Sequence, residues 1–411
     1  MSADSADLPR SSAPWLARRF AVAWVFLLVS AGLGALLRLV PLAPLDMIVY
    51  GHVLHAHSHV AFLGWIFNAF FVVALRHFIL PDQASGYDVP WWTMQAAVLG
   101  MLASFPAQGY GAVSIAFSTL HMVASAVFAW KLWRGNLAAP GARFFLRAAL
   151  VCMLVSGLGP IALGPLAALD LRDSPAYPLA IYFYLHFQCN GWFVFFLLAL
   201  GLQRLAGAGA PTVSRRLEYA GWLLAAGCVL TFALSALWLD PPRWVQAVAL
   251  VGGALQLAGG GCLLAALRAP GPWKSRGVSR LLLHVAIGSL VLKLLLQFAG
   301  ALPGLAALAA QRYIVIAFLH LIFLGFVTPA LVHWAIEEGW LPGGRWRARE
   351  IGIALFLGGA LATEIVLVLP TALALCGWSI ALPVPALLLA AAVLLVASIA
   401  VLGAALRTAA E

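Results

Sequence analysis

The chain has very few charged residues and no closely paired cysteines. Charged side chains make up 9% of its 411 residues, whereas hydrophobic residues make up 64%. Because soluble domains carry about 25% charged residues, this composition excludes an ordinary water-soluble protein. The five cysteines form no CxxC pair, which argues against a disulfide framework and against a zinc or iron–sulfur site. The sequence therefore predicts an integral membrane protein.

Long hydrophobic runs account for most of the chain. A helix needs about 20 apolar residues to cross roughly 30 Å of hydrocarbon. Twelve runs meet this requirement, at residues 20–40, 51–80, 91–109, 112–133, 143–167, 176–203, 217–239, 243–267, 279–302, 312–336, 350–369 and 383–406. The predicted fold class is all-α, a polytopic bundle of 12 transmembrane helices. It forms a single transmembrane domain, residues 1–411, with a short cytoplasmic tail at residues 1–19. No internal repeat stands out among the runs.

Lysine and arginine are distributed unevenly between the two sides of the membrane. Loops that stay in the cytoplasm carry an excess of these residues. Nineteen of the 24 fall in the N-terminal tail, in alternate loops and near the C-terminus, whereas the opposite side has only Arg38, Arg172, Arg243 and Arg312. Both termini are therefore predicted to be cytoplasmic, in a bacterial inner membrane. This bias and anionic lipid explain the net charge of +10, so no nucleic-acid partner is expected.

Histidines gather at the outer end of the second run. Four of them lie within eight residues: His52, His55, His57 and His59. An ionisable side chain inside a bilayer is costly and marks a functional site by default, and imidazole is the commonest metal ligand. The tenth run starts from the same side and places His320 about 12 Å into the membrane, at 1.5 Å per residue. His121 and His186 reach a comparable depth on two further runs. Four helices therefore offer histidine at one level.

Helical spacing divides the cluster between two faces of the second run. At 100° per residue, His52, His55 and His59 share one face, and His57 points to nearly the opposite side. A bis-imidazole haem needs one histidine from each of two facing helices. Either His57 or His59, together with His320, would satisfy this requirement. The candidates for a second metal or haem pocket are His55, His59, His121 and His186.

Two further charged residues lie inside predicted spans. Lys293 falls near the middle of the ninth run and Glu364 in the outer half of the eleventh. They could line a proton or ion path, pair with one another, or contact haem propionates, and the sequence leaves these alternatives open. His77 and His333 fall near cytoplasmic ends, where anchoring at the interface is the expected role.

The arrangement resembles subunit I of the haem-copper oxidases and nitric oxide reductases, which has twelve spans and both termini inside. The word from His57 to Gly64 is similar to the span-two segment of that family, whose histidine ligates the low-spin haem. The word from Tyr313 to His320 is similar to the span-ten segment, so the resemblance places His320 on the low-spin ligand.

The chain also departs from that family's pattern. Phe318 stands where the high-spin haem ligand is expected, and the run 217–239 lacks the two adjacent histidines that help to bind copper. His186 could occupy the copper-ligand position of the sixth span, and Asn190 stands where some oxidases carry a cross-linked tyrosine. The resemblance therefore implies an oxidase-like bundle without a full oxygen-reducing centre.

A closer likeness in character is to the NnrS family of haem- and copper-containing membrane proteins, implicated in nitric oxide tolerance. It rests on the His57-Ser58-His59 word followed by Gly64, and on the segment that begins at His320. The resemblance implies haem of b type, possible copper, and electron transfer or the binding or reduction of a small gas such as nitric oxide. An oxidoreductase of this kind would take electrons from a redox protein or a quinol.

A different class of function also accommodates the histidines. Imidazole-rich sites suit copper and zinc without any haem, so the chain could instead be a transporter or handling protein for a transition metal. Against this alternative, the convergent histidines all lie in the outer half, and no polar path continues inward apart from Lys293.

Overall fold

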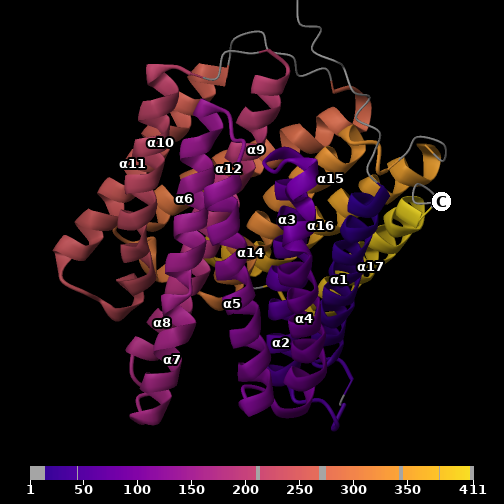
Figure 1. Cartoon of the computed structure of the whole chain (residues 1–411). Coiled ribbons are helices and arrows are strands. Elements are labelled where there is room, and N and C mark those ends of the chain that lie inside the picture. Colours follow the sequence, from indigo (N-terminus) through magenta and orange to yellow (C-terminus); the bar gives the residue numbers. More distant parts are fainter. Residues whose placement is uncertain are drawn as a thin grey trace, which may run out of the picture.

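The computed structural model describes residues 14–43, 45–209, 213–267, 275–341, 346–378 and 380–407. Every element in these ranges is a helix (Figure 1). Residues 1–13 of the predicted tail lie outside the described residues, as do Arg10, Arg268, Lys274 and Arg345 of the predicted cytoplasmic charges.

Eleven helices within the described ranges are long and apolar enough to cross a membrane. The chain is therefore a multi-span membrane protein. The predicted run 91–109 forms α4 (Asp88–Gln108), which is not among the eleven. Its 21 residues would reach about 31 Å at 1.5 Å per residue, but it includes Asp88, Gln95 and Gln108, which lower its mean hydropathy.

The first unit of the bundle contains α4 and its neighbours. Its other helices are α1 (Pro14–Leu39), α2 (Tyr50–His59), the π-helix η1 (Val60–Phe67), α3 (Asn68–His77), the short η2 (Pro81–Tyr87) and α5 (Ala112–Gly135). α2, η1 and α3 form one continuous span, which packs on α1, and α4 packs on α5. α1 begins at Pro14, a residue type favoured in the first helical turn, so Arg18 and Arg19 belong to the helix and not to a tail.

The second unit repeats this plan with some breaks. Its helices are α6 (Pro140–Ser156), α7 (Leu158–Ala168), α8 (Ala176–His186), the π-helix η3 (Phe187–Trp192), α9 (Phe193–Gly207), α10 (Arg215–Leu230), the 3-10 helix η4 (Thr231–Leu239) and α11 (Arg243–Leu267). α8, η3 and α9 form the continuous span, which packs on α6, and α10 packs on α11.

The third unit has the same order again. Its helices are α12 (Gly277–Gly300), the single turn α13 (Ala306–Ala309), α14 (Arg312–His320), the π-helix η5 (Leu321–Val327), α15 (Thr328–Glu337), α16 (Trp346–Leu375) and α17 (Val384–Arg407). α14, η5 and α15 form the continuous span, which packs on α12, and α16 packs on α17.

The first and last helices close the bundle. α1 packs along α17, and the indole of Trp24 donates a hydrogen bond of 2.9 Å to the carbonyl of Ile399. Trp24 lies in the first half of α1 and Ile399 in the last third of α17, so the two helices run antiparallel. The start of α1 and the end of α17 therefore lie at the same end of the bundle (Figure 1).

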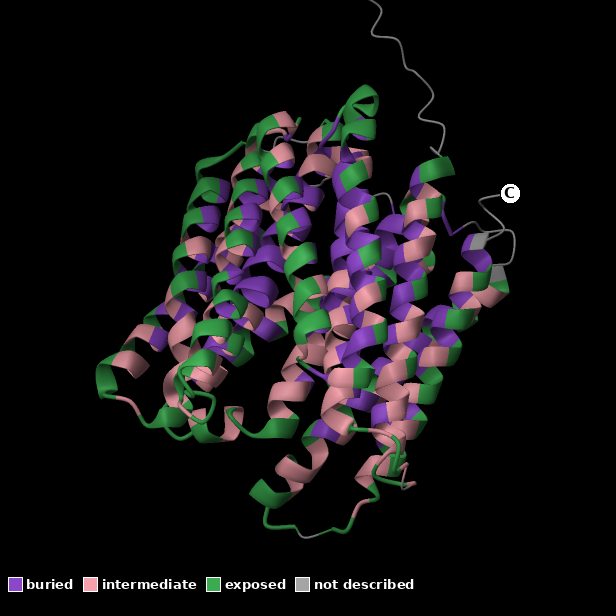
Figure 2. Cartoon of the chain, turned by 60° about the horizontal axis from the view of Figure 1, so that its bottom comes forward, coloured by how far each residue is buried: buried purple, intermediate pink, exposed green. Residues whose placement is uncertain are grey.

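The core lies between the second and sixth predicted spans. In the apolar 18-residue segment of each of these two spans, 78% of the residues are buried, whereas 39% are buried in the corresponding segment of the first span. Stacked rings of Phe70 and Phe196, 4.3 Å apart, join the two spans. Burial is concentrated in the halves that contain α3 and α9, while the α2 and α8 halves keep many partly accessible residues (Figure 2).

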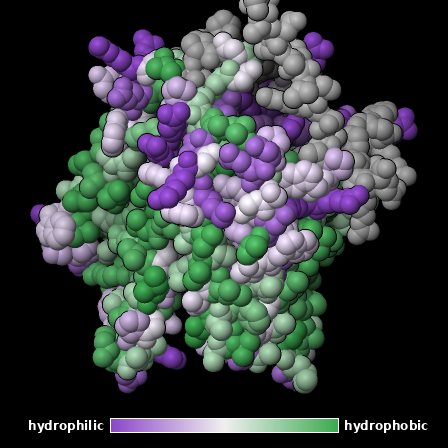
Figure 3. Space-filling model, viewed as in Figure 1, coloured by the Kyte–Doolittle hydropathy of each residue, from purple (hydrophilic) through white to green (hydrophobic). Residues whose placement is uncertain are grey.

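The surface has the pattern expected of a protein in a bilayer. Hydrophobic side chains cover the lower and middle part, and hydrophilic ones gather at the upper end, where α3, α9 and α15 finish (Figure 3). In the same view a notch separates the lower ends of the α7–α8 segment and α5. The apolar band identifies the lipid bilayer as the surroundings of the chain.

Candidate functional site

The three continuous spans share a local feature that bears directly on the histidines. In each one the α-helix ends at a histidine, and a π-helix begins at the next residue. The three histidines are His59, His186 and His320. A π-turn inserts an extra residue per turn and appears frequently at functional sites, because it re-aims the side chains around it.

A glycine follows each of these histidines after four intervening residues. These glycines are Gly64, Gly191 and Gly325, and each is followed by an aromatic residue. A Cβ at Gly64 would lie 2.9 Å from the ring of Phe26 on α1, and one at Gly325 would lie 2.7 Å from Oγ of Ser289 on α12. Because a side chain would not fit, glycine lets each central span approach the span before it closely.

The sequence therefore carries a repeat that was not expected. The word is histidine, four residues, glycine and tryptophan or phenylalanine, and it occurs once in each unit of the bundle. Its signal could have been found by aligning the second, sixth and tenth runs on their histidines. Only these three positions are shared, so the repeat is weak in the sequence and is recognised from the matching order of helices.

His57 faces α1. Its Nδ1 lies 2.8 Å from the carbonyl oxygen of Ser30, so Nδ1 carries the proton and donates. Nε2 is then left with a free lone pair, which is the form of imidazole that binds a metal. A second-shell hydrogen bond of this kind fixes the orientation of a ligating histidine. A Cβ at Gly34 would lie only 3.1 Å from Cε1 of this ring, so glycine makes the space for it.

His320 is the partner of His57 across the bundle. The two rings lie within electrostatic range of each other, and the Arg38 guanidinium is in range of both. Nδ1 of His320 is buried and has no hydrogen-bond partner among the described residues. A buried nitrogen without a partner is costly unless it meets another group. The structure thus places these two residues within electrostatic range of each other, on α2 and α14.

Positive charge lies at the outer end of this pair. Arg38 ends α1, Arg312 starts α14, and the two are within electrostatic range of each other. The Arg312 guanidinium also lies 6.0 Å from the ring centre of Tyr50. Two like charges held together favour an anionic group between them. The distribution of lysine and arginine predicts both residues on the outer side, but nothing in the sequence indicates a role for them in the site.

The other histidines of α2 face α4 and α5, as their spacing predicted. The ring centres of His59 and Phe105 are 4.3 Å apart, and those of His55 and Tyr110 are 4.5 Å apart. Nδ1 of His59 donates to the His55 carbonyl at 2.9 Å, so Nε2 of His59 is free.

His121, on α5, lies within electrostatic range of His59. The Ser125 hydroxyl donates to the His121 carbonyl at 2.8 Å and accepts from Nδ1 of His121 at 3.1 Å. Nε2 of His121 therefore has a lone pair, and it is buried without a partner. The prediction that α2 serves two neighbours from opposite faces is confirmed.

His186 lies apart from both pairs. Its Nε2 donates to the Cys228 carbonyl at 2.7 Å, and its Nδ1 accepts from the Asn190 amide at 3.0 Å. Both ring nitrogens are therefore used within the chain, and the predicted role of His186 as a metal ligand gains no support.

Lys293 and Glu364 are not joined to each other. Nζ of Lys293 donates to Gln297 at 2.6 Å and lies within electrostatic range of Cys189 and Cys228. Oε1 of Glu364 is buried without a hydrogen-bond partner, and no ion pair among the described residues includes it. Of the alternatives left open by the sequence, direct pairing of Lys293 and Glu364 is excluded by these contacts.

The C-terminal ends of α3 and α15 form a separate polar cluster. Nε of Arg76 donates to Glu338 at 2.7 Å. Nε2 of His77 lies 3.3 Å from the same carboxylate and also 2.7 Å from the indole nitrogen of Trp334. Because the buried indole can only donate, Nε2 of His77 must accept from it, which leaves Arg76 as the standing partner of Glu338. His77 thus links the end of α3 to the end of α15 through Trp334.

The geometry sets what the candidate site can hold. Within the described ranges, no group of three or more histidine, cysteine, aspartate or glutamate side chains is placed to hold a metal ion. Haem needs only one histidine on each face, because the porphyrin supplies the other four nitrogens. His57 and His320 offer one histidine from each of two spans, and Nδ1 of His320 is buried without a hydrogen-bond partner.

Comparison with known proteins adds no family assignment. No protein-family model matches the chain, and no curated protein sequence matches it.

Proposed function

We propose that this chain is a haem-binding integral membrane protein that carries out electron transfer coupled to the binding or reduction of a small gas such as nitric oxide. In this proposal His57 and His320 are the axial ligands of one low-spin haem of b type. A bound haem would supply a one-electron iron couple at this point. The observation that carries the proposal is the convergence of His57 and His320, from two different units of the bundle, with Nε2 of His57 unprotonated.

The protein groups around the pair also suit haem. Gly34 leaves room for the His57 ring, and the Ser30 carbonyl holds that ring in one tautomer. Arg38 and Arg312 provide the positive charge that two propionates require at the outer end. The sequence leaves open whether His57 or His59 is the ligand. His57 is chosen here, because the ring of His59 faces Phe105 of α4 instead.

The second pair is proposed as the place where the small molecule or a copper ion binds. An iron with two histidine ligands has no open axial position, so a gas needs another site. His59 lies on the face of α2 opposite to His57, and His121 lies on α5. Each of these two histidines has an unprotonated Nε2. His55 and Tyr110 lie towards the outer end of the same face. Electrons would come from a redox protein or a quinol.

The bundle itself supports an oxidase-like arrangement with 12 spans. Three units of the same order follow one another, and α1 and α17 begin and end at the same end of the bundle. Two ends on the same side of a membrane require an even number of crossings. α4 is therefore proposed to cross the membrane as well, in addition to the eleven longer and more apolar helices. With the excess of arginine and lysine at that end, both termini face the cytoplasm of a bacterial inner membrane.

The proposal is tested with three single substitutions in purified protein. We expect His57→Ala and His320→Ala each to abolish the low-spin spectrum and to reduce haem content several-fold. His52→Ala is the matched control, because it removes an imidazole from the same helix, α2, but from the opposite face, where His52 lies 3.4 Å from the Pro106 carbonyl. Full haem content and an unchanged spectrum in both test variants would refute the ligand assignment.

A second candidate function is supported by one observation. His52, His55 and His59 descend along one face of α2 towards His121, which is the order that an entry route for copper or zinc would have. Metal uptake by proteoliposomes that is lost in a His59→Ala/His121→Ala variant, in protein that binds no haem, would favour this transporter over the haem protein.

A further inference from the structure

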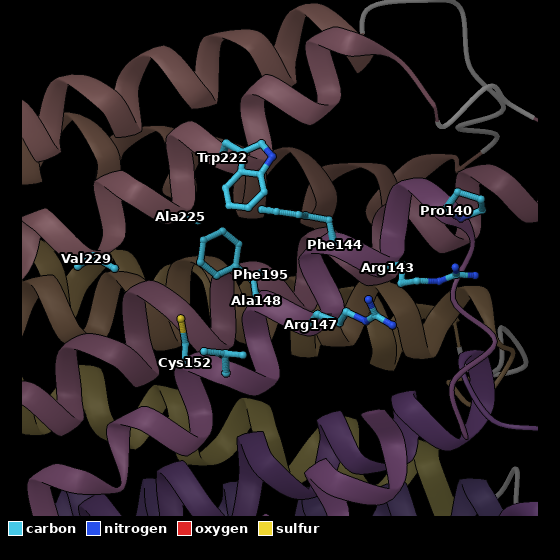
Figure 4. A pocket seen from close by; sticks show the side chains of 11 residues that line it. Pro140, Arg143, Phe144, Arg147, Ala148, Cys152, Phe195, Trp222, Ala225 and Val229 are labelled. Atoms are coloured by element: carbon cyan, nitrogen blue, oxygen red, sulfur yellow. The ribbon is translucent and has the colours of Figure 1, made fainter. Parts of the chain in front are cut away.

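A cleft on the far side of the bundle has no part in the histidine site. It lies between α6, α9 and α10 and has a volume of about 440 Å³. α6 contributes one continuous stripe of side chains to it, α10 contributes Trp222, Ala225 and Val229, and α9 contributes Phe195 (Figure 4). Pockets of roughly 300–1,000 Å³ hold small ligands, so the cleft is large enough for one.

Charge and polarity are separated along the cleft. Arg143 and Arg147 lie at one end, next to Pro140, whereas Cys152 and Val229 lie at the other (Figure 4). Arg143 and Cys152 are nine positions apart, which corresponds to about 13 Å along α6 at 1.5 Å per residue. The cleft therefore presents two cations at its mouth and an apolar slot behind them.

The two arginines are positioned for an anion. They are four residues apart and so lie on the same face of α6, and both are exposed. Arg143 donates to the Ala138 carbonyl at 3.2 Å, and the Arg147 guanidinium lies 5.0 Å from the ring centre of Trp133. Both side chains are thereby held at the end of the cleft next to Pro140. No aspartate or glutamate lines the cleft to neutralise them.

The walls are aromatic and fixed. The rings of Phe144 and Trp222 meet edge to face, 4.9 Å apart. A Cβ at Gly221 would lie 2.7 Å from the Phe144 ring, so α10 approaches α6 closely at this level. Beyond these rings the small side chains of Ala148 and Ala225 leave the slot open.

We propose that this cleft binds an anionic phospholipid, with its phosphate on Arg143 and Arg147 and an acyl chain in the slot. Basic pockets between transmembrane helices on the cytoplasmic side bind lipids of this charge. A quinol fits less well, because its two hydroxyl groups need hydrogen-bond partners and the lining has no histidine, carboxylate or amide side chain.

The test uses full-length protein in nanodiscs that contain phosphatidylcholine and phosphatidylglycerol. Lipids that remain bound after detergent extraction are counted by native mass spectrometry. Each arginine near an anionic headgroup contributes roughly fivefold, so we expect Arg143→Gln/Arg147→Gln to lower the preference for phosphatidylglycerol about 30-fold. Arg215→Gln/Arg216→Gln is the matched control, since it removes two exposed arginines at the start of α10 that do not line the cleft.

A third variant separates the slot from the charges. Ala225→Phe keeps both arginines but fills the apolar part, so it should also lose the bound phosphatidylglycerol. Equal losses in the two arginine variants would overturn the proposal, because they would show a general surface charge effect. The proposal also fails if no variant changes lipid retention, or if a neutral quinone co-purifies and is displaced by Ala225→Phe but not by Arg143→Gln/Arg147→Gln.

Discussion

Replacing Gly34 by valine tests how tightly the fold positions His57. A Cβ at Gly34 would lie 3.1 Å from Cε1 and 3.4 Å from Nδ1 of the ring, and valine adds two methyl groups beyond it. The ring must then move, which weakens the 2.8 Å hydrogen bond to Ser30. Removing such a second-shell contact typically lowers metal affinity about 10- to 100-fold, or about 1.4 to 2.7 kcal/mol. We expect a loss of haem affinity in this range with the fold retained.

Haem affinity is measured by optical titration of haem into apoprotein in detergent. Gly32→Val is the matched control, because it places the same side chain on the same helix where a Cβ would meet nothing within 4 Å. We expect its affinity to stay within about twofold of the unmodified protein. Unchanged affinity in Gly34→Val would refute the role of His57, and equal losses in both variants would attribute the effect to helix propensity.

Three further predictions concern stability, each measured as thermal unfolding in detergent. Burial alone would raise the pKa of Glu338, but the ion pair with Arg76 outweighs it and holds the pKa below its ordinary value of 4.5, so the stabilisation from this pair is present above pH 4.5 and is lost as the pH falls through the lowered pKa. Because Arg76 is the main partner of Glu338, Glu338→Gln should lower the free energy of unfolding by about 2 kcal/mol at pH 7 and should flatten its dependence on acid pH. Glu218 is exposed, so the control Glu218→Gln should change neither the stability nor its pH dependence. Asn68 and Gln95 exchange two buried hydrogen bonds. Asn68→Leu leaves Gln95 unsatisfied and should lower the free energy of unfolding by about 1–3 kcal/mol, whereas Asn68→Leu/Gln95→Leu removes both partners and should lower it less. A larger loss in the double variant would contradict the pairing. Gly325→Ala should lower the free energy of unfolding by about 1–3 kcal/mol, because the new methyl group would clash with the Ser289 hydroxyl. Adding Ser289→Ala should restore part of this stability, and no restoration would contradict the close approach of the two spans.

The sequence predicted the features that depend on regular helix geometry. The spans followed from hydropathy, and the division of the α2 histidines between two faces followed from 100° per residue. The contacts of His57 with α1 and of His59 with α4 both agree with that division. The start of α1 was placed too late, because charged Arg18 and Arg19 were assigned to a tail although they continue the helix.

Features that depend on irregular helices and distant contacts were not predicted. A π-turn changes the direction of the residues around it, and nothing in hydropathy marks its position after His59, His186 or His320. The partners of His57 lie on other helices, so neither the Ser30 carbonyl nor the space at Gly34 could be read from spacing. The internal bonds of His186 were hidden for the same reason.

The central claim is that the chain carries a haem between His57 and His320. The most direct test is the optical spectrum of the purified, full-length protein, oxidised and then reduced with dithionite, beside a metal analysis of the same sample. The account predicts a sharp reduced α-band and about one iron per chain, as a bis-histidine haem gives. A featureless spectrum with copper or zinc bound would contradict it and would support the metal-handling function instead.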